Sequence, residues 1–221
     1  MTDRIKTQEL FDLSHTLAWE LLSGCVYPWE ALGRISEAIM NIGDQLDTNI
    51  YAKTADDIWI ARNALISPTA EITGPCIIGE NTQIRPGAYI RGNVLIGNGA
   101  VIGNSTELKN CIIFDSAEVP HFNYVGDSIL GYKAHMGAGS VTSNVKGNKT
   151  LVVVHGEIEY PTGLRKFGAM LGDMTEIGCN TVLNPGTIIG RNTQVYPLSS
   201  IRGVIPENSI VKTSGNIYKK R

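Results

Sequence analysis

The chain has 221 residues and a formal net charge of -2, with acidic and basic side chains interspersed. This balance does not favour nucleic acid or an anionic membrane surface as the main partner, and the length suits one sizeable domain with an appendage. No apolar run approaches the ~20 residues of a membrane span, and the first ten residues lack the apolar core of a signal peptide. We therefore expect a cytoplasmic protein without a membrane partner.

The first 57 residues are predicted to be helical. Leucines recur at helical intervals before Gly24, and a second amphipathic stretch runs from Pro28 to Gly43, both of them residues that often bound helices. The first set comprises Leu10, Leu13, Leu17 and Leu21. We expect residues 1–57 to form two helices that cap the segment after them.

A six-residue repeat begins at Ile58. Ile or Leu occupies the third position of successive blocks: Ile60, Ile66, Ile72, Ile78, Ile84, Ile90, Ile96, Ile102 and Leu108. The repeat returns at Leu171, Ile177, Leu183, Ile189, Val195 and Ile201. Simple amphipathic helices and alternating strands do not repeat at six.

This repeat predicts a coil with flat sides, each a short strand with one inward aliphatic residue. Gly and Asn recur between the strands and suit the corners. Successive coils would stack as parallel strands at ~4.8 Å, so that each coil buries its face only against its neighbours.

The repeat resembles that of the hexapeptide-repeat family, which implies an all-β fold, the left-handed parallel β-helix. We expect this solenoid over residues 58–205 and a short tail over residues 206–221. Residues 143–167 interrupt the repeat and should stand out from the prism as a loop. Within them, two apolar stretches flank His155-Gly156, which predicts a hairpin turn.

A more specific resemblance begins at Arg85. The segments "IRPGAYI", "ELKN", "VPHFNYVGDS", "MGAGSVTSN" and "GNK" follow one another in that order. In order and spacing they resemble the C-terminal acetyltransferase domain of the bifunctional sugar-1-phosphate nucleotidyltransferase/acetyltransferases that make UDP-N-acetylglucosamine. The segments "RKFGAMLGD", "GCN" and "LNPGTIIG" are similar to the last coils of the archaeal members.

The resemblance implies roles for the acceptor side of a site. His121 is the implied general base, and Asn144 acts beside it. Tyr124 helps to hold an amino sugar that carries a phosphate or nucleotide. Arg85 and Lys109 would face the phosphate.

Further roles follow from the same resemblance. Lys149 would line the site, and His135 stands where the bacterial members usually have Asn, so the acceptor's identity is open. Gly137, Ala138, Gly139 and Cys179 would lie along the thioester of acetyl-CoA. The family is a homotrimer with sites between neighbouring prisms. No bound metal is expected for the chemistry.

Elementary chemistry agrees with these roles. Imidazole, with an unperturbed pKa of ~6.5, can accept a proton from an attacking amine near neutral pH. A Gly-Ala-Gly corner leaves a backbone N–H for the charge on the thioester oxygen. Arg and Lys are natural partners of a sugar phosphate.

The nucleotidyltransferase domain of the bifunctional family has no counterpart in these residues, and we expect no pyrophosphorylase activity. One alternative is a non-catalytic, trimeric partner of a separate nucleotidyltransferase. A second is a zinc enzyme with histidine ligands between subunits, for which His121 and His135 are candidates without a third. A third is acyl transfer to an amino acid or its precursor.

The four cysteines, Cys25, Cys76, Cys111 and Cys179, form no C-x-x-C pair, and no disulfide framework is expected.

Overall fold

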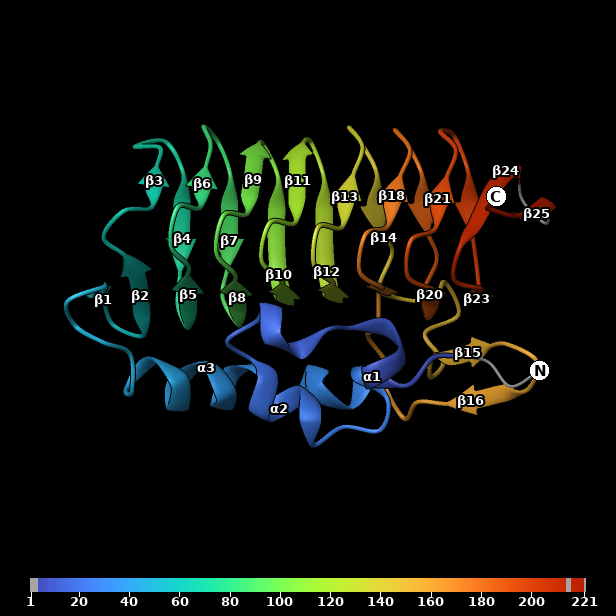
Figure 1. Cartoon of the computed structure of the whole chain (residues 1–221), viewed down its shortest axis with the longest axis horizontal. Helices are drawn as coiled ribbons and strands as arrows, with labels where there is room; N and C mark the ends of the chain where they lie inside the picture. The colour runs from blue at the N-terminus through green and yellow to red at the C-terminus, as the bar shows by residue number, and fades with distance from the viewer. Residues whose placement is uncertain (1–3, 214–215, 221) are drawn as a thin grey trace.

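Three columns of short parallel strands build a left-handed parallel β-helix in the computed structural model, which describes residues 4–213 and 216–220 (Figure 1). The predicted fold class is thereby confirmed. Residues 1–3, 214–215 and 221 of the predicted N-terminal and C-terminal segments lie outside the described residues. No helix in the described part of the chain combines the length and apolar character needed to cross a membrane.

The first face contains β2 (Ile58–Ala61), β5 (Cys76–Ile78), β8 (Val94–Ile96), the ends of β10 (Glu107–Ile113) and β12 (Tyr124–Leu130), β17 (Ala169–Leu171), β20 (Thr187–Ile189) and β23 (Val204–Ile205). The second face contains β4 (Glu71–Thr73), β7 (Tyr89–Arg91), the starts of β10 and β12, β14 (Val141–Thr142), β19 (Val182–Leu183) and β22 (Ser200–Ile201). The third face contains β3 (Leu65–Ile66), β6 (Gln83–Ile84), β9 (Val101–Asn104), β11 (Glu118–His121), β13 (His135–Met136), β18 (Glu176–Ile177), β21 (Gln194–Val195) and β24 (Ser209–Thr213). Antiparallel strands β1 (Tyr51–Ala55) and β25 (Asn216–Lys219) pair with β2 and β24 at the two ends.

The inward positions form aliphatic ladders, as the repeat predicts. Ile78 pairs with Ile96 on the first face, and Ile84 pairs with Ile102 on the third. The later members of the repeat, from Leu171 to Ile201, belong to the same buried cluster. Since these residues and the other apolar members of the cluster fill the narrow interior, the hydrophobic effect fixes the register of the coils.

Residues with positive φ occupy the corners, where Asn is the most frequent type other than Gly. Asn81, Asn93, Asn110, Asn180, Asn192 and Asn208 all have φ near +50°. The repeat glycines serve a different need, because the next coil passes against them. At Gly103 an added Cβ would lie 1.4 Å from the carbonyl oxygen of Pro120.

The repeat breaks where the coils become one residue shorter. Paired residues are eighteen apart at Ile78 and Ile96 but seventeen apart at Ile96 and Ile113. In the longer coil two residues with positive φ, Gly92 and Asn93, turn the corner between the second and first faces. In the shorter coils one residue does so, and β10 and β12 run around the corner unbroken.

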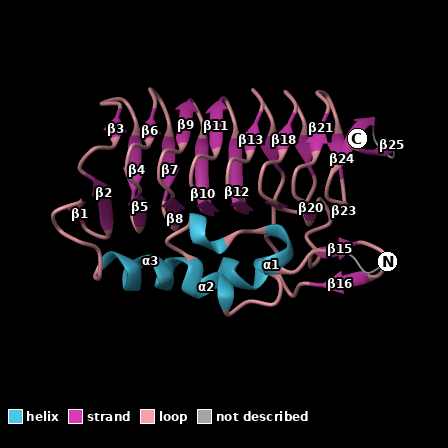
Figure 2. Ribbon diagram, in the orientation of Figure 1, coloured by secondary structure: helices cyan, strands magenta, loops and turns pink. Residues whose placement is uncertain are grey.

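The helical segment lies along the side of the first face, not over an end of the prism as expected, and a hairpin over residues 153–161 lies beside the C-terminal part of the same face (Figure 2). It comprises α1 (Thr7–Leu10), the 3₁₀ helix η1 (Leu13–His15), α2 (Trp19–Ser23), the 3₁₀ helix η2 (Pro28–Arg34) and α3 (Ile35–Gly43). The physical reason is that the outward residues of this face are apolar too. They include Ile77, Leu95, Ile112, Ile129, Met170 and Ile188, all buried in one cluster with helix residues such as Leu32 and Ile39 and with loop residues such as Val154.

The expected first helix is broken into short pieces. The solenoid supplies hydrogen-bond partners that compete with a continuous helix. Asp173 accepts from the backbone N–H of Asp12 at 2.7 Å, and its own N–H donates to the carbonyl of Leu10 at 3.0 Å. The carbonyl of His15 likewise accepts from the N–H of Asp115.

The predicted hairpin is present, formed by β15 (Val153–His155) and β16 (Glu159–Pro161). The loop that carries it stands out less than expected, because Val152, Val154 and Phe167 are fully buried in the same cluster as the helices. Tyr27 and Trp29 stack at 4.6 Å between ring centroids and contact Tyr160 and Phe167. The helices thus pack against the loop of residues 143–167.

A pair of adjacent substitutions tests whether the first face is buried on both sides. Ile77 faces the helices and Ile78 the interior, and both are fully buried. We expect Ile77→Ala and Ile78→Ala each to lower the free energy of unfolding by about 2–5 kcal/mol, measured by urea unfolding. A loss below about 0.5 kcal/mol for Ile77→Ala alone would mean that the helices do not cover this face.

Candidate functional site

One edge of the prism, between the third and second faces, carries the predicted base and the predicted thioester-binding residues. The carbonyl of His121 accepts from Gly139 N–H at 3.0 Å, and the carbonyl of Ala138 accepts from Asn180 N–H at 2.8 Å. His121, Ala138 and Cys179 therefore stack on consecutive coils, spaced by the ~4.8 Å of neighbouring strands. We call these three residues and Gly137 the His121 edge.

Backbone donors line this edge. Gly137 N–H donates to Ile177 and Gly139 N–H to His121, so both are used within the solenoid. The N–H groups of Ala138 and Cys179 have no acceptor among the described residues. These two groups are the ones left to meet an oxygen of a bound ligand.

Arg85 lies on the same side of the prism, two coils before His121. It directly follows β6, its backbone N–H donates to the carbonyl of Ile102 in β9, and its guanidinium donates to Gln83 Oε1 at 3.3 Å. No hydrogen bond or ion pair of the described residues joins it to the other predicted phosphate ligands.

A second group of predicted residues gathers at the opposite end of the second face, around the corner residue Asp127. Asn144 Nδ2 donates to Asp127 Oδ2 at 2.5 Å and to Tyr124 Oη at 3.2 Å. Lys109 Nζ lies 3.7 Å from the same carboxylate oxygen. We call Lys109, Tyr124, Asp127 and Asn144 the Asp127 cluster.

Asp127 was missed by the reasoning from sequence, which assigned its three neighbours. The available signal was its position in "YVGDS", where it occupies the same corner as Asn110 in "LKNC" one coil earlier. That equivalence depends on the shortened coils, which the six-residue repeat does not describe.

Tyr124 is half-buried, and burial raises the pKa of its phenol above 10.0, with the nearby charge of Asp127 as the next cause. The hydroxyl therefore stays neutral through the physiological range. A neutral hydroxyl that accepts from Asn144 keeps its own hydrogen to donate to a ligand.

His135 lies on the third face, apart from both groups. Its Nδ1 is 3.0 Å from Glu176 Oε2. The two residues border a groove of about 300 Å³ that continues past Gly137 and Cys179 to Tyr196. His135 thus shares a groove with Gly137 and Cys179, two of the residues predicted to lie along the thioester.

Lys149 is exposed on the loop after Asn144, with φ of 57°, and the structure does not join it to the Asp127 cluster. A polar groove of about 360 Å³ lies beside this loop, lined by residues including Val145, Lys146 and Arg202. Within residues 4–213 and 216–220, no three His, Cys, Asp or Glu side chains are gathered as metal ligands.

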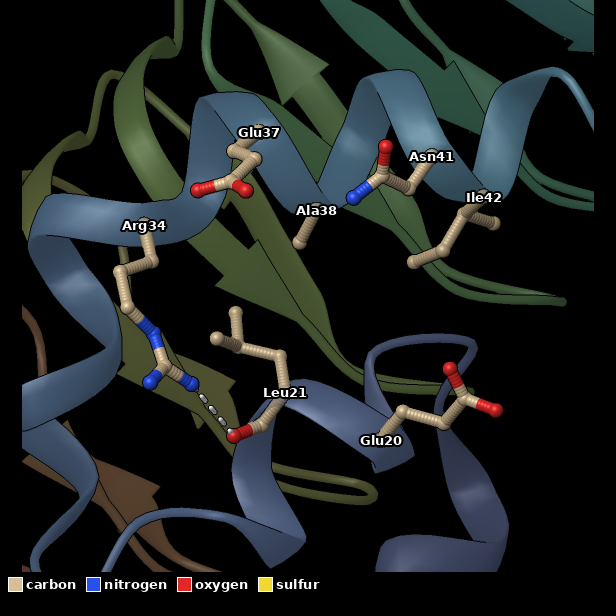
Figure 3. Close-up of a pocket in the computed structure, with 7 residues that line it drawn as sticks. All are labelled: Glu20, Leu21, Arg34, Glu37, Ala38, Asn41 and Ile42. Atoms are coloured by element: carbon tan, nitrogen blue, oxygen red, sulfur yellow. Dashed lines mark hydrogen bonds between the residues drawn. The ribbon is translucent and has the colours of Figure 1, made fainter.

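A third groove, of about 330 Å³, lies in the helical cover between α2 and α3 (Figure 3). Arg34 crosses it and donates to the carbonyl of Leu21 at 3.2 Å, and Glu37 lines it on the α3 side (Figure 3). It contains none of the residues predicted for the site.

Known proteins resemble this chain in sequence. The profile of the GMPPB C-terminal domain matches residues 72–159. Bifunctional protein GlmU of Methanococcus aeolicus is 31% identical over 211 residues, which cover 87% of this chain and 46% of that protein. GlmU of Methanocaldococcus jannaschii is 30% identical over 202 residues, covering 87% of this chain and 50% of that protein.

The chain resembles bifunctional protein GlmU. It spans about half the length of these curated relatives. A solved hexapeptide transferase family protein from Anaplasma phagocytophilum is 16% identical, with a TM-score of 0.42 over 73% of this chain and 78% of that one. The predicted resemblance to a hexapeptide-repeat acyltransferase of the bifunctional type is confirmed by the GlmU matches.

Cysteine accessibility tests the placement of Cys179 on the open edge. Cys179 is exposed, Cys76 and Cys111 lie in the ladders, and burial raises the pKa of these two thiols and that of Cys25. We expect one fast-reacting thiol in a native titration with an aromatic disulfide, lost in Cys179→Ser, and four after unfolding. Acetyl-CoA should slow the fast reaction. Two or more fast thiols would contradict this placement.

Proposed function

We propose that the chain is an acetyl-CoA-dependent N-acetyltransferase that acts on an amino sugar carrying a phosphate or a nucleotide. One observation carries this proposal. A single coil bears His121 and, three residues later, Tyr124, while the next coil bears both the Gly137–Gly139 corner and Asn144. The His121 edge, proposed for the acyl donor, and the Asp127 cluster, proposed for the acceptor, thus lie at the two ends of the same stretch of the second face.

The proposed step is direct attack of the amine on the thioester. The amine nitrogen bonds to the carbonyl carbon while its proton passes to the imidazole of His121. The C–S bond then breaks, and the thiolate of coenzyme A takes up that proton from the imidazolium of His121 and leaves as the thiol. The N–H groups of Ala138 and Cys179, which have no acceptor among the described residues, would donate to the carbonyl oxygen as it gains charge.

The Asp127 cluster would hold the acceptor. Lys109 offers a positive charge, and Tyr124 offers a neutral hydroxyl for a phosphate oxygen. Arg85 and Lys149 are proposed as further phosphate ligands, supported only by the resemblance and by their positions near the second face. His135 is proposed to contact substrate from the groove that it shares with Cys179.

We also propose a homotrimer in which a neighbouring prism completes the site. Phe122 and Leu198 support this, since these large apolar side chains are 64% and 81% exposed along the His121 edge. A cytoplasmic location and the lack of pyrophosphate release from UTP stay predictions.

The test is coenzyme A release by the purified protein with acetyl-CoA and a panel of amino-sugar phosphates and nucleotide amino sugars. Light scattering in the same buffer gives the oligomer mass. We expect turnover on at least one acceptor and an oligomer mass three times that of one chain. No turnover on the panel, together with no binding of acetyl-CoA in calorimetry, would favour the non-catalytic trimeric partner.

A further inference from the structure

We propose that Asp127 is a positioning residue that fixes which polar atoms Asn144 and Tyr124 present to the acceptor. This inference deepens the proposed function and rests on it. Asp127 is only 5% exposed and forms the single-residue corner of β12, with φ of 49°. Burying a carboxylate is unfavourable unless its oxygens receive donors.

Donors from both neighbouring coils converge on this carboxylate. Oδ1 accepts from Asn110 Nδ2 at 2.9 Å, and Oδ2 accepts from Asn144 Nδ2 at 2.5 Å. Lys109 Nζ approaches Oδ2 at 3.7 Å. A carboxylate can only accept, so each amide must turn its NH₂ group toward Asp127.

This requirement decides which outward-facing atoms of Asn144 and Tyr124 are hydrogen-bond donors and which are acceptors. One hydrogen of the Asn144 amide goes to Asp127 and the other to Tyr124 Oη. The Asn144 Oδ1 atom then points away, and it has no donor among the described residues. Asn144 therefore presents an acceptor, suited to an N–H or O–H of the sugar, while Tyr124 presents a donor, suited to a phosphate oxygen.

The backbone at this corner does not depend on the carboxylate. The carbonyl of Asp127 accepts from Gly168 N–H at 2.8 Å, and that of Asn144 accepts from Phe167 N–H at 3.0 Å. Asn110 adopts the same corner conformation one coil earlier, with φ of 48°. Asparagine therefore fits this corner, and Asp127→Asn changes the hydrogen-bond polarity while it keeps the shape.

Asp173→Asn is the matched control. Asp173 is also a buried corner carboxylate, 6% exposed, but it accepts from the backbone of Asp12 and Tyr132 and contacts none of the proposed site residues. We expect Asp127→Asn to lower kcat/KM for the acceptor roughly 10- to 100-fold, the worth of a hydrogen bond to a charged group. This fall should come from a higher KM for the acceptor, while the KM for acetyl-CoA should stay unchanged. Asp173→Asn should change neither KM.

The exchanged double variant, Asp127→Asn with Asn144→Asp, separates positioning from structure. It restores an amide–carboxylate pair at the corner but presents the wrong polarity to the acceptor and to Tyr124. We expect thermal stability to recover toward that of the wild type while kcat/KM stays low. Recovery of both would overturn the inference, because any paired corner would then suffice.

One readout does not need turnover. The side-chain NH₂ signals of Asn144, assigned by their loss in Asn144→Ala, should exchange slowly with solvent in the wild type and in Asp173→Asn, and rapidly in Asp127→Asn. Rapid exchange in the wild type would overturn the inference even if the enzyme is active. Slow exchange without turnover on any acceptor would instead contradict the proposed function.

Discussion

Replacing His121 by alanine should lower the turnover number of acetyl transfer by roughly 10²- to 10⁴-fold, the usual contribution of a positioned general base. His121 is the last residue of β11, at the start of the proposed site, and it is exposed. No hydrogen bond or ion pair of its ring occurs within the described residues, whereas its backbone is held by Asn123 and Gly139. The ring is therefore available to take a proton from a bound amine.

The same substitution should leave stability within about 0.5 kcal/mol of the wild type, since an exposed ring without partners adds little to folding. His155→Ala is the control, because His155 is exposed on the β15–β16 hairpin beside Glu159 and far along the chain from the proposed base. Steady-state coenzyme A release and thermal unfolding should be measured for both variants. Full activity of His121→Ala would reject the base, and an equal loss in His155→Ala would point to a general effect of the substitutions.

Gly103→Ala should have the largest effect on folding. The added Cβ would overlap the carbonyl oxygen of Pro120 at 1.4 Å, so that β11 has to move away from β9. That shift would break the pairing of Val119 with Ile102 and of His121 with Asn104. We expect a loss of more than about 4 kcal/mol, beyond the ordinary range for single substitutions, or no folded protein at all.

Gly33→Ala is the matched control for this prediction. Gly33 lies in η2, where an added Cβ would meet nothing within 4 Å and φ is not positive. Gly33→Ala should leave the free energy of unfolding unchanged or raise it by about 0.4–1 kcal/mol. Equal midpoints of thermal unfolding for the two variants would show that the coils do not approach each other at Gly103 as closely as the structure places them.

The interior of the solenoid could be predicted from the sequence because one physical constraint recurs at each coil. Every inward position must fill the same narrow space, so Ile78, Ile96 and Leu171 report the register directly. Left-handedness came from the resemblance alone, since general chirality rules favour right-handed crossovers.

The position of the helices could not be predicted from the same periodicity. The sequence does hold a signal, because an apolar residue precedes each first-face ladder position, as in Ile77 before Ile78 and Leu95 before Ile96. Two adjacent buried residues in a strand indicate that both of its sides are covered. The break-up of the first helix depends on Asp173, which is far away in sequence.

The grouping of the Asp127 cluster was equally hidden from the sequence, although the resemblance supplied Lys109, Tyr124 and Asn144 and only Asp127 was missed. Tyr124 and Asn144 are twenty residues apart, and only the shortened coils bring them to one corner. The residues of the His121 edge were assigned from the resemblance, and their stacking on consecutive coils is visible only in the structure. Their grouping with the Asp127 cluster into one site remains a proposal that a neighbouring prism would complete.

The most direct test of the account follows the acetyl group itself. Acetyl-CoA labelled with ¹³C at the carbonyl should be incubated with the acceptor selected from the panel, and the product examined by NMR. We predict an amide carbonyl coupled to the sugar nitrogen, formed in step with coenzyme A release and slowed at least 10²-fold by His121→Ala. An ester on a sugar hydroxyl, or label found only as free acetate, would contradict N-acetyl transfer by this site.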